Sequence, residues 1–277
     1  GFEFSATYRN RDHDFKYEVS ANLITLRNRV TSLGFGTDSY ISGSYITKVG
    51  EEIGQFYGWV YEGIARTQEV LDNHATQEGA QIGDCLYKDV NNDGKVDSED
   101  QVVLGSGMPK INFGLNARFE YKRFDLSIAT FGALNYHVSD DIYNSLNSCY
   151  GWGNKEVGML DANRFSEDGS TYLSNVPRTY VTNSASLGWN DLFSSRKIQN
   201  AAYWKIANVE LGYNFPDKWF DKYVSDVRFY ISAQNLHTFT GYHGYNVDYA
   251  GGTFTPGYNF CSYPTARTFM CGVHFTF

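Results

Sequence analysis

The stretch Arg267–Phe277 reads RTFMCGVHFTF, and it contains the pattern that best predicts the fold. Every second residue in it is apolar, and these residues are Phe269, Cys271, Val273, Phe275 and Phe277. An alternation with a period of two indicates a β-strand with one apolar and one more polar face. A strand that ends a chain on a bare aromatic residue is rare in soluble proteins, whereas the closing strand of an outer-membrane barrel often ends in this way.

The same alternation occurs in six upstream segments, at residues 2–8, 15–23, 111–121, 124–128, 203–215 and 227–234. In the fifth of these the alternation slips near Asn208, which predicts a β-bulge there. With the terminal segment, the patterns predict about seven strands. Cys271 lies on the apolar face of its strand, where we expect a small buried thiol.

The connections between these segments alternate between short and long. The short ones are Asn10–Asp14, Tyr121–Phe124 and Pro216–Asp226, and the long ones cover about 32–110, 133–200 and 237–266. Tight turns at one end of the strands and large loops at the other are typical of a membrane barrel, as are the aromatic residues near the short turns. The sequence therefore predicts an all-β fold in which residues 1–277 form part of a transmembrane antiparallel β-barrel with long extracellular loops. A soluble β-sandwich is the alternative fold, because it alternates equally well.

Composition narrows the class of protein further. Charged residues make up 19% of the chain and aromatic residues 17%, and the mean hydropathy is −0.42. No run approaches the roughly 18 apolar residues of a membrane helix, which excludes a helical membrane protein. A barrel is still allowed, because half of each strand faces a polar lumen. The net charge of −8 comes without a Lys/Arg cluster, which argues against nucleic acid as a partner.

Seven strands would form an open sheet, which cannot stand alone in a membrane. The N–H and C=O groups at its edges would go unpaired in hydrocarbon, at a cost of several kcal/mol each. We therefore expect the remainder of the barrel to lie before Gly1.

The segment Asp89–Asp100 reads DVNNDGKVDSED and has the spacing of a calcium-binding loop. The candidate ligands occupy positions 1, 3, 5, 7, 9 and 12 of such a loop, and they are Asp89, Asn91, Asp93, Lys95, Asp97 and Asp100. Lys95 would contribute only its backbone carbonyl, Gly94 permits the sharp turn, and Val96 is expected to anchor the loop. Position 12 departs from the pattern, because Asp100 stands in place of the usual Glu. A structural Ca²⁺ is therefore predicted, with an Asx-rich turn that solvates itself as the alternative.

The sequence contains no nucleophile-elbow, phosphate-loop, dinucleotide-binding or zinc-protease motif, so we expect no catalytic residues and no enzyme. Five loop aromatics are candidates for stacking on sugar rings or for holding the loops together, and they are Tyr150, Trp152, Trp189, Tyr242 and Tyr245. The four cysteines have no metal-type spacing and are either free thiols or two disulfides.

Four parts of the sequence resemble the SusC/RagA-type TonB-dependent outer-membrane transporters of Bacteroidetes. They are GEEIGQFYGWVYEGI (Gly50–Ile64), IGDCLYKDVNNDGKVDSEDQVVLGSGMPK (Ile82–Lys110), YWKIANVELGYNFP (Tyr203–Pro216) followed by RFYISAQNLHTFTGYHGYN (Arg228–Asn246), and SYPTARTFMCGVHFTF (Ser262–Phe277). Their order and spacing span nearly the whole chain. The departures are Cys85, which interrupts the second part, and Asn246-Val247-Asp248, which stands where many members carry Asp-Pro-Glu.

The resemblance implies the C-terminal part of a barrel of about 22 strands that is closed by a plug, with the plug, TonB box and early strands absent here. It also implies a location in the outer membrane of a Gram-negative bacterium, a SusD-like surface lipoprotein over the long loops, import of oligosaccharides or peptides, and energy supplied through TonB. Phe275 and Phe277 would belong to the signal for outer-membrane assembly. A surface carbohydrate-binding β-sandwich with a calcium loop is the alternative function, and a β-rich glycoside hydrolase is a third.

Overall fold

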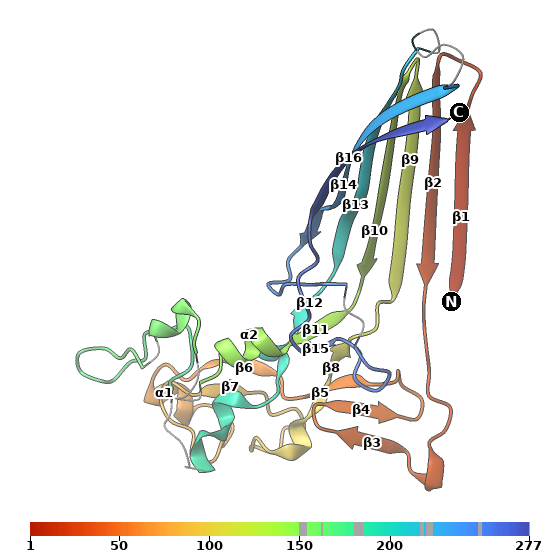
Figure 1. Ribbon diagram of the computed structural model, residues 1–277. Helices are drawn as coiled ribbons and strands as arrows, with labels where there is room; N and C mark the ends of the chain where they lie inside the picture. Colours follow the sequence, from red (N-terminus) through yellow and green to blue (C-terminus); the bar gives the residue numbers. More distant parts are fainter. Residues whose placement is uncertain are drawn as a thin grey trace.

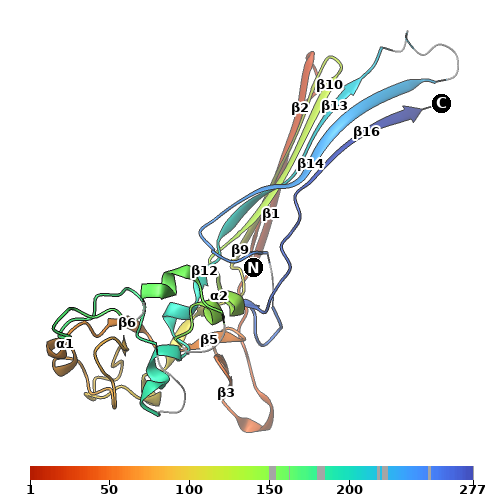
Figure 2. The same ribbon diagram turned by 60° about the vertical axis from the view of Figure 1, so that its left-hand side comes forward.

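The computed structural model describes residues 1–149, 154–161, 163–179, 185–216, 219, 224–248 and 251–276. It consists of two regions, which both ribbon views show (Figures 1 and 2). One is a tall, curved β-sheet. The other, called the loop body below, is formed by the three long connections 26–110, 135–202 and 241–267, which gather at one end of the sheet.

The tall sheet has seven strands. They are β1 (Phe2–Asn10), β2 (Phe15–Thr25), β9 (Ile111–Tyr121), β10 (Phe124–Leu134), β13 (Tyr203–Asn214), β14 (Asp226–Thr240) and β16 (Thr268–Thr276). They lie in the sheet in chain order, and every neighbouring pair is antiparallel. The short connections lie at the end of the sheet away from the loop body. The last strand, β16, runs toward that same end (Figure 1). The predicted antiparallel β-sheet is therefore confirmed.

The predicted bulge is also present, because the register between β13 and β14 shifts next to Asn208. Two strands continue beyond the ends that the sequence pattern indicated. In β10 the sequence pattern ends at Ile128, because Thr130 and Gly132 occupy the next positions on the apolar face and are not large apolar residues. In β14 it broke at Asn235, whose φ of 51° marks a backbone irregularity that the strand passes through.

The register places the apolar residues of the seven strands on one face of the sheet. One row runs straight across five strands, through Phe15, Tyr121, Phe124, Tyr213 and Phe229. These side chains are largely uncovered, with an exposed fraction of 53% for Phe124. The sheet rises from the loop body as a single layer, and no other described element packs against it over most of its height (Figures 1 and 2). A soluble sandwich would bury this face beneath a second sheet, so the alternative fold is wrong.

Cys271 lies on this apolar face, as expected, but it is exposed. The expectation of a buried thiol is wrong, because no described part of the chain covers the face. The two edges of the sheet are open as well, since β1 pairs only with β2 and β16 only with β14 within the described residues. Open edges are available for pairing with further strands.

The loop body contains three small sheets. The first orders β3 (Ser39–Ser42), β4 (Tyr45–Lys48), β5 (Gln55–Gly58) and β8 (Val102–Ser106); the second pairs β6 (Tyr61–Ile64) with β7 (Cys85–Tyr87); the third orders β12 (Gln199–Asn200), β11 (His137–Asp140) and β15 (Tyr258–Asn259). These strands were not predicted, because segments of two to five residues are too short to show alternation.

The helices of the loop body are short. They are α1 (Gln68–Asp72) and α2 (Asp141–Leu146), with 3₁₀ turns at Gly34–Gly36, Ser98–Asp100, Val157–Asp161, Ala185–Asp191 and Ser195–Lys197. Across the described ranges, none of the helices combines the length and the apolar character that a membrane crossing requires.

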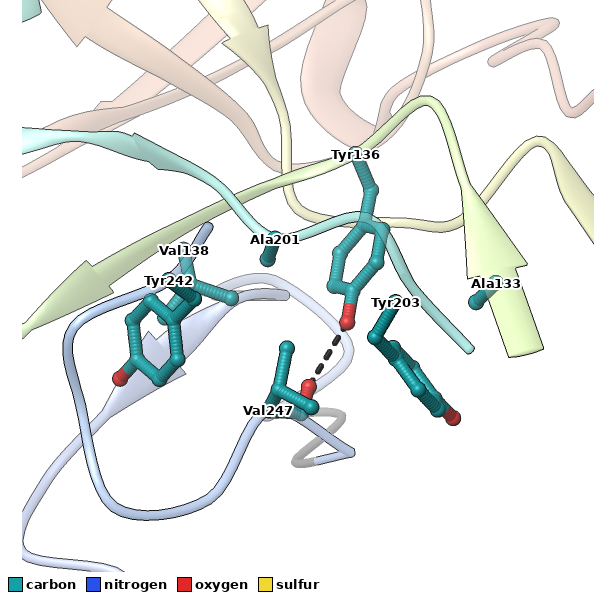
Figure 3. Close-up of a cluster of buried hydrophobic side chains, with 7 residues drawn as sticks. All are labelled: Ala133, Tyr136, Val138, Ala201, Tyr203, Tyr242 and Val247. Atoms are coloured by element: carbon teal, nitrogen blue, oxygen red, sulfur yellow. Dashed lines mark hydrogen bonds between the residues drawn. The ribbon is translucent and has the colours of Figure 1, made fainter. Parts of the chain in front are cut away.

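A hydrophobic cluster joins the loop body to the sheet (Figure 3). It consists of Ala133, Tyr136, Val138, Ala201, Tyr203, Tyr242 and Val247. Ala133 and Tyr203 pair across β10 and β13 on the face opposite the apolar row, whereas the other members come from the second and third long connections. The Tyr136 hydroxyl donates a hydrogen bond to the Val247 carbonyl at 2.7 Å. The cluster therefore anchors the loop body against the loop end of the polar face.

Candidate functional site

The polar face of the sheet carries ion pairs that cross between strands. The Arg228 guanidinium contacts Asp125 (Nε–Oδ1 3.0 Å) and Glu210 (Nη2–Oε1 2.8 Å), so it links β14, β10 and β13. Arg9 of β1 pairs with Glu18 of β2 at an Nε–Oε2 distance of 2.7 Å. Charges on one face and apolar side chains on the other are the arrangement of a barrel with a polar interior and a lipid-facing exterior.

The predicted calcium loop forms a tight turn in the loop body. Asp89 Oδ2 accepts a hydrogen bond from Gly94 N at 2.8 Å, and Asn91 Oδ1 accepts one from Asp93 N at 3.0 Å. Asp93 Oδ1 in turn accepts from Lys95 N at 2.9 Å. Gly94 has a φ of 86°, which a glycine adopts without strain. The turn therefore satisfies its own backbone donors with its side-chain oxygens.

Asp97 and Asp100 close the loop at its second end. The Asp97 side chain accepts from Glu99 N at 2.8 Å, and Asp97 N donates to Asp100 Oδ2 at 2.9 Å. Asp100 is fully buried, and its other oxygen accepts from Val90 N at 2.7 Å. Burial alone would raise the pKa of Asp100, but the N–H groups of Asp97, Val90 and Asn91 hold it below its usual value. Asp100 is thus kept charged by backbone donors.

The fit of this loop to Ca²⁺ is partial. The carboxylate and amide oxygens of Asp89, Asn91 and Asp93 are of the kind that Ca²⁺ prefers. Asp100 does not fit as a ligand in this conformation, because both of its oxygens already accept backbone hydrogen bonds. Over the described ranges, no three His, Cys, Asp or Glu side chains are grouped so that they could hold a metal ion. Calcium binding therefore stays a prediction, whereas Val96 is buried in a cluster with Cys85, as an anchor should be.

The structure separates the aromatic candidates. Tyr150 and Trp152 lie outside the described residues. Tyr242 is buried, its hydroxyl donates to the Asp140 carboxylate, and it accepts a hydrogen bond from Asn259 Nδ2 at 2.9 Å. Tyr242 therefore holds the second and third long connections together and is not free to contact a ligand.

Trp189 and Tyr245 are accessible from the surface. Tyr245 is 65% exposed. Trp189 lines a surface groove of about 630 Å³ together with Trp59. Trp59 was missed in the sequence, because it lies far from Trp189 along the chain and a single sequence gives no sign that the two meet. Trp59 lies in Gly50–Ile64, one of the stretches that carry the family resemblance. That resemblance is the only sequence signal that could have drawn attention to Trp59.

A buried ion pair between the first and second long connections was also missed. Asp84 is fully buried, its Oδ2 accepts from Arg178 Nη2 at 3.0 Å, and its Oδ1 accepts from Asn190 Nδ2 at 2.8 Å. The preceding Gly83 has a φ of 94°, and a Cβ there would lie 3.0 Å from the Tyr172 ring and 3.1 Å from Arg178 Cβ. Glycine at position 83 thus allows the two connections to meet closely. In the sequence, the Gly83-Asp84 dipeptide was the only local indication of this buried ion pair.

The two residues assigned to the assembly signal lie at the end of β16. Phe275 is on the apolar face, opposite Val227, and is 50% exposed. Phe277 lies outside the described residues. Their role in assembly stays a prediction.

Comparison with known sequences bears on the fold and the site together. No family model matches the chain. It is 28% identical over 296 residues to TonB-dependent receptor P3 of Formosa agariphila, covering 100% of this chain and 28% of that receptor. It is 25% identical over 284 residues to TonB-dependent receptor SusC of Bacteroides thetaiotaomicron, covering 100% of this chain and 26% of that receptor. The chain therefore spans less than a third of the length of these relatives.

Solved structures agree with this result. The chain superimposes on a structure of the RagAB peptide transporter with a TM-score of 0.78 at 20% identity, over 99% of this chain and 28% of that one. For the RagAB peptide importer in its closed-closed state, the TM-score is 0.73 at 21% identity, over 99% and 29%. At this identity the structural likeness establishes the fold. All these proteins are named as receptors, transporters or importers, in agreement with the expectation that the chain is not an enzyme.

Proposed function

We propose that the chain is a segment of a SusC/RagA-type TonB-dependent transporter of the bacterial outer membrane, and that it forms part of the barrel wall through which the complete receptor imports nutrients. The observation that carries the proposal is the opposite chemistry of the two faces of the tall sheet. The face with Phe124 and Phe229 would contact lipid, and the face with Arg228 and its carboxylate partners would line the polar interior. The remainder of the barrel would pair with the open edges of β1 and β16.

The dimensions of the apolar face support this placement. Strands β9 and β10 contain 11 residues each, and a tilted membrane strand needs roughly 9–11. Aromatic rings lie at both ends of the apolar band. Phe124 and Tyr213 meet at the short-turn end with ring centroids 4.8 Å apart, and Trp204 stacks on Phe239 at the loop end at 5.3 Å. Such rings favour the two interfaces between lipid and water, so the loop body would lie outside the cell.

The position of the loop body leads to the proposed partners. We infer that it contributes to the surface that meets a SusD-like lipoprotein, and that the cargo is an oligosaccharide or a peptide. Energy would arrive from TonB through parts of the receptor other than this segment. The support comes from the relatives, one named SusC and others described as a RagAB peptide transporter or importer.

Removal of the closing strand tests the proposal. Deleting Phe269–Phe277 from the full-length receptor would strip β14 of its partner, and each unpaired backbone group costs several kcal/mol in lipid. We expect the truncated receptor to be absent from the outer membrane in fractionation and surface-proteolysis experiments. A matched variant with Met270→Ser and His274→Ser keeps the apolar face and should insert normally. Normal insertion of the truncated receptor would contradict the proposal.

A further inference from the structure

A groove of about 590 Å³ crosses the apolar face of the tall sheet, on strands β10, β13, β14 and β16. It is called the sheet groove below. Two rows of paired residues form its surface, with Leu211, Ile231 and Cys271 in one row and Val209, Ala233 and Phe269 in the next. The sheet groove therefore belongs to the face that the proposed function places in lipid.

The groove forms where a small side chain lies between larger ones. Ala233 pairs with Val209 on one side and with Phe269 on the other. Phe269 is 69% exposed, so its ring stands above the short side chain of Ala233. The next pair along the two strands, Asn208 and Gln234, borders the β-bulge, and a bulge increases the local twist of a sheet. The depression is thus a consequence of both side-chain size and backbone register.

The chemistry of the sheet groove suits a hydrocarbon chain. No charged side chain among the described residues lines it, and Ser232 carries the only hydroxyl group of the lining. Ser232 is buried and pairs with Glu210 on the polar face, so it contributes backbone to the groove. A protein partner would need about one hydrogen bond per 100–200 Å² of interface, and the groove offers no side-chain group for such bonds. A hydrocarbon chain needs none.

The sheet groove lies in the half of the sheet next to the short turns. Leu126, which lines the groove, pairs with Leu211, and this pair lies two residues along β10 from the aromatic pair Phe124–Tyr213. Two residues of a strand span about 7 Å. Because Phe124 and Tyr213 mark the proposed lipid–water interface away from the loop body, the groove begins about 7 Å inside that interface. The acyl chains of the periplasmic leaflet begin at this depth.

We infer that the sheet groove binds one acyl chain of a glycerophospholipid from the periplasmic leaflet, an assignment that rests on the proposed barrel placement. The hydrophobic effect does not drive this binding, because lipid chains are as apolar as the groove. Dispersion contacts drive it instead, since an unfilled depression leaves its lining without partner atoms. A chain in the groove contacts protein on several sides, whereas a chain on a flat part of the face contacts it on one. The volume of about 590 Å³ lies within the usual range for ligand sites, roughly 300–1,000 Å³.

A matched pair of variants tests the sheet groove. Ala233→Phe fills it with a ring. Ala117→Phe adds the same ring to the same face outside the groove, because Ala117 of β9 pairs with Val19 and Ile128 and does not line it. Both alanines are half-buried. The mobility shift of the heat-modifiable barrel establishes that each full-length receptor has folded into lipid.

The full-length receptor is reconstituted in vesicles of phosphatidylethanolamine and phosphatidylglycerol. A trace of phosphatidylethanolamine carries a photoreactive diazirine on one acyl chain, and labelled peptides are identified by mass spectrometry. We expect peptides with Leu211, Ile231 or Phe269 to be labelled about tenfold more than the peptide with Ala117; tenfold corresponds to about 1.4 kcal/mol. Ala233→Phe should remove this excess, and Ala117→Phe should retain it. In a second arm, vesicles that also contain lipopolysaccharide should show the same excess, because the periplasmic leaflet supplies the chain.

Four outcomes would overturn the inference. Even labelling of the whole apolar face would mean that the groove meets bulk lipid only, and an undiminished excess in Ala233→Phe would place the bound chain elsewhere. Displacement of the label by lipopolysaccharide would assign the groove to the other leaflet. Protection of the groove that disappears when the receptor is diluted in the vesicles would show that a second copy covers it. Each of these results leaves the proposed barrel placement intact, whereas a complete absence of label from the apolar face would contradict the proposed function itself.

Discussion

The tall sheet and the loop body place their apolar side chains in opposite ways. Among the described residues, the buried hydrophobic side chains lie mainly in the loop body, and the sheet contributes Ala133, Tyr203 and Val227. Residues such as Phe124 and Ile231 belong to regular, paired strands of the sheet and are still exposed. Apolar side chains are therefore mostly buried in the loop body and mostly exposed in the sheet. The change occurs where the strands enter the loop body.

The difference shows that the two regions are built for different surroundings. The loop body has a core that excludes water, as at Phe56, which is fully buried with its ring 5.0 Å from Tyr45 and 5.9 Å from Phe193. The apolar face of the sheet has no such core. In water that face would destabilise the sheet, whereas in hydrocarbon it satisfies both the side chains and the paired backbone.

The largest difference between the two regions is expected when a buried phenylalanine of the loop body is replaced. Phe56→Ala should destabilise the loop body by about 3–5 kcal/mol, the usual loss for removing a buried aromatic ring from a core. Phe229→Ala removes a ring of the same size from the apolar face of β14 and should leave loop-body unfolding unchanged, because Phe229 lies in the tall sheet and Phe56 in the loop body. Denaturant titration of the full-length receptor in detergent, monitored by proteolysis of the loop body, measures both. Equal effects of the two changes would contradict the assignment of separate environments.

The two faces of one strand give the next largest effect. Ile231→Arg places a charge on the apolar face of β14 and should cost about 2–4 kcal/mol of folding free energy in a bilayer if it lies near mid-membrane. Gln234→Arg places the same charge three residues along the strand on the polar face, where it is exposed and opposite Asn208. We expect only Ile231→Arg to impair folding into lipid vesicles, followed by the mobility shift of the heat-modifiable barrel. A larger loss for Gln234→Arg would mean that the faces are reversed.

A smaller effect is expected at the buried carboxylate of the loop body. Asp100→Ala leaves its backbone donors without an acceptor and should cost about 1–3 kcal/mol at pH 7. The pKa of Asp100 is lowered on folding, so its contribution is full above the unfolded value of about 3.9 and is lost as the pH falls through the lower folded value. The difference between wild type and variant should therefore shrink in acid. A difference that does not change with pH would show that the charge of Asp100 is not what stabilises the turn.

The smallest effect concerns calcium. If Asp89, Asn91 and Asp93 bind Ca²⁺ with a dissociation constant of about 0.1–1 mM, as extracellular loops do, 1 mM Ca²⁺ would stabilise the protein by about 0.4–1.4 kcal/mol. Calorimetric titration of the EDTA-treated receptor should show this binding, and Asp93→Ala should remove it. No heat at millimolar Ca²⁺ would retire the calcium prediction and leave the self-satisfied turn.

The sheet was predictable from sequence because its signal is local and repeated. Alternation over five or more residues located the strands, and the slip at Asn208 located the bulge. The pattern failed where a small residue such as Gly132 sits on the apolar face. The pattern also wrongly predicted that Cys271 is buried. An apolar position on a strand normally packs against other protein, but no described residue covers this face of the sheet.

The loop body was much less predictable, because its structure depends on contacts between distant segments. Asp84 meets Arg178 and Trp59 lies near Trp189 only after two long connections fold together. A single sequence records the residues but not their pairing. Even the loop aromatics divide by context, since Tyr242 is buried in a hydrogen-bond network whereas Tyr245 is exposed.

Contact between the apolar face and lipid can be measured at Cys271, which is exposed on that face opposite Ile231. A nitroxide label is attached there in the full-length receptor with Cys261→Ser. Cys85 and Cys149 should resist labelling, because burial shields them and raises their pKa values to about 11 and about 12.

In lipid bilayers, the label at Cys271 should collide more often with oxygen, which concentrates in lipid, than with a water-soluble nickel chelate. A label at Gln234→Cys, in a receptor with Cys271→Ser and Cys261→Ser, should show the reverse preference. Greater accessibility of Cys271 to the nickel chelate would contradict the placement of the apolar face in the membrane.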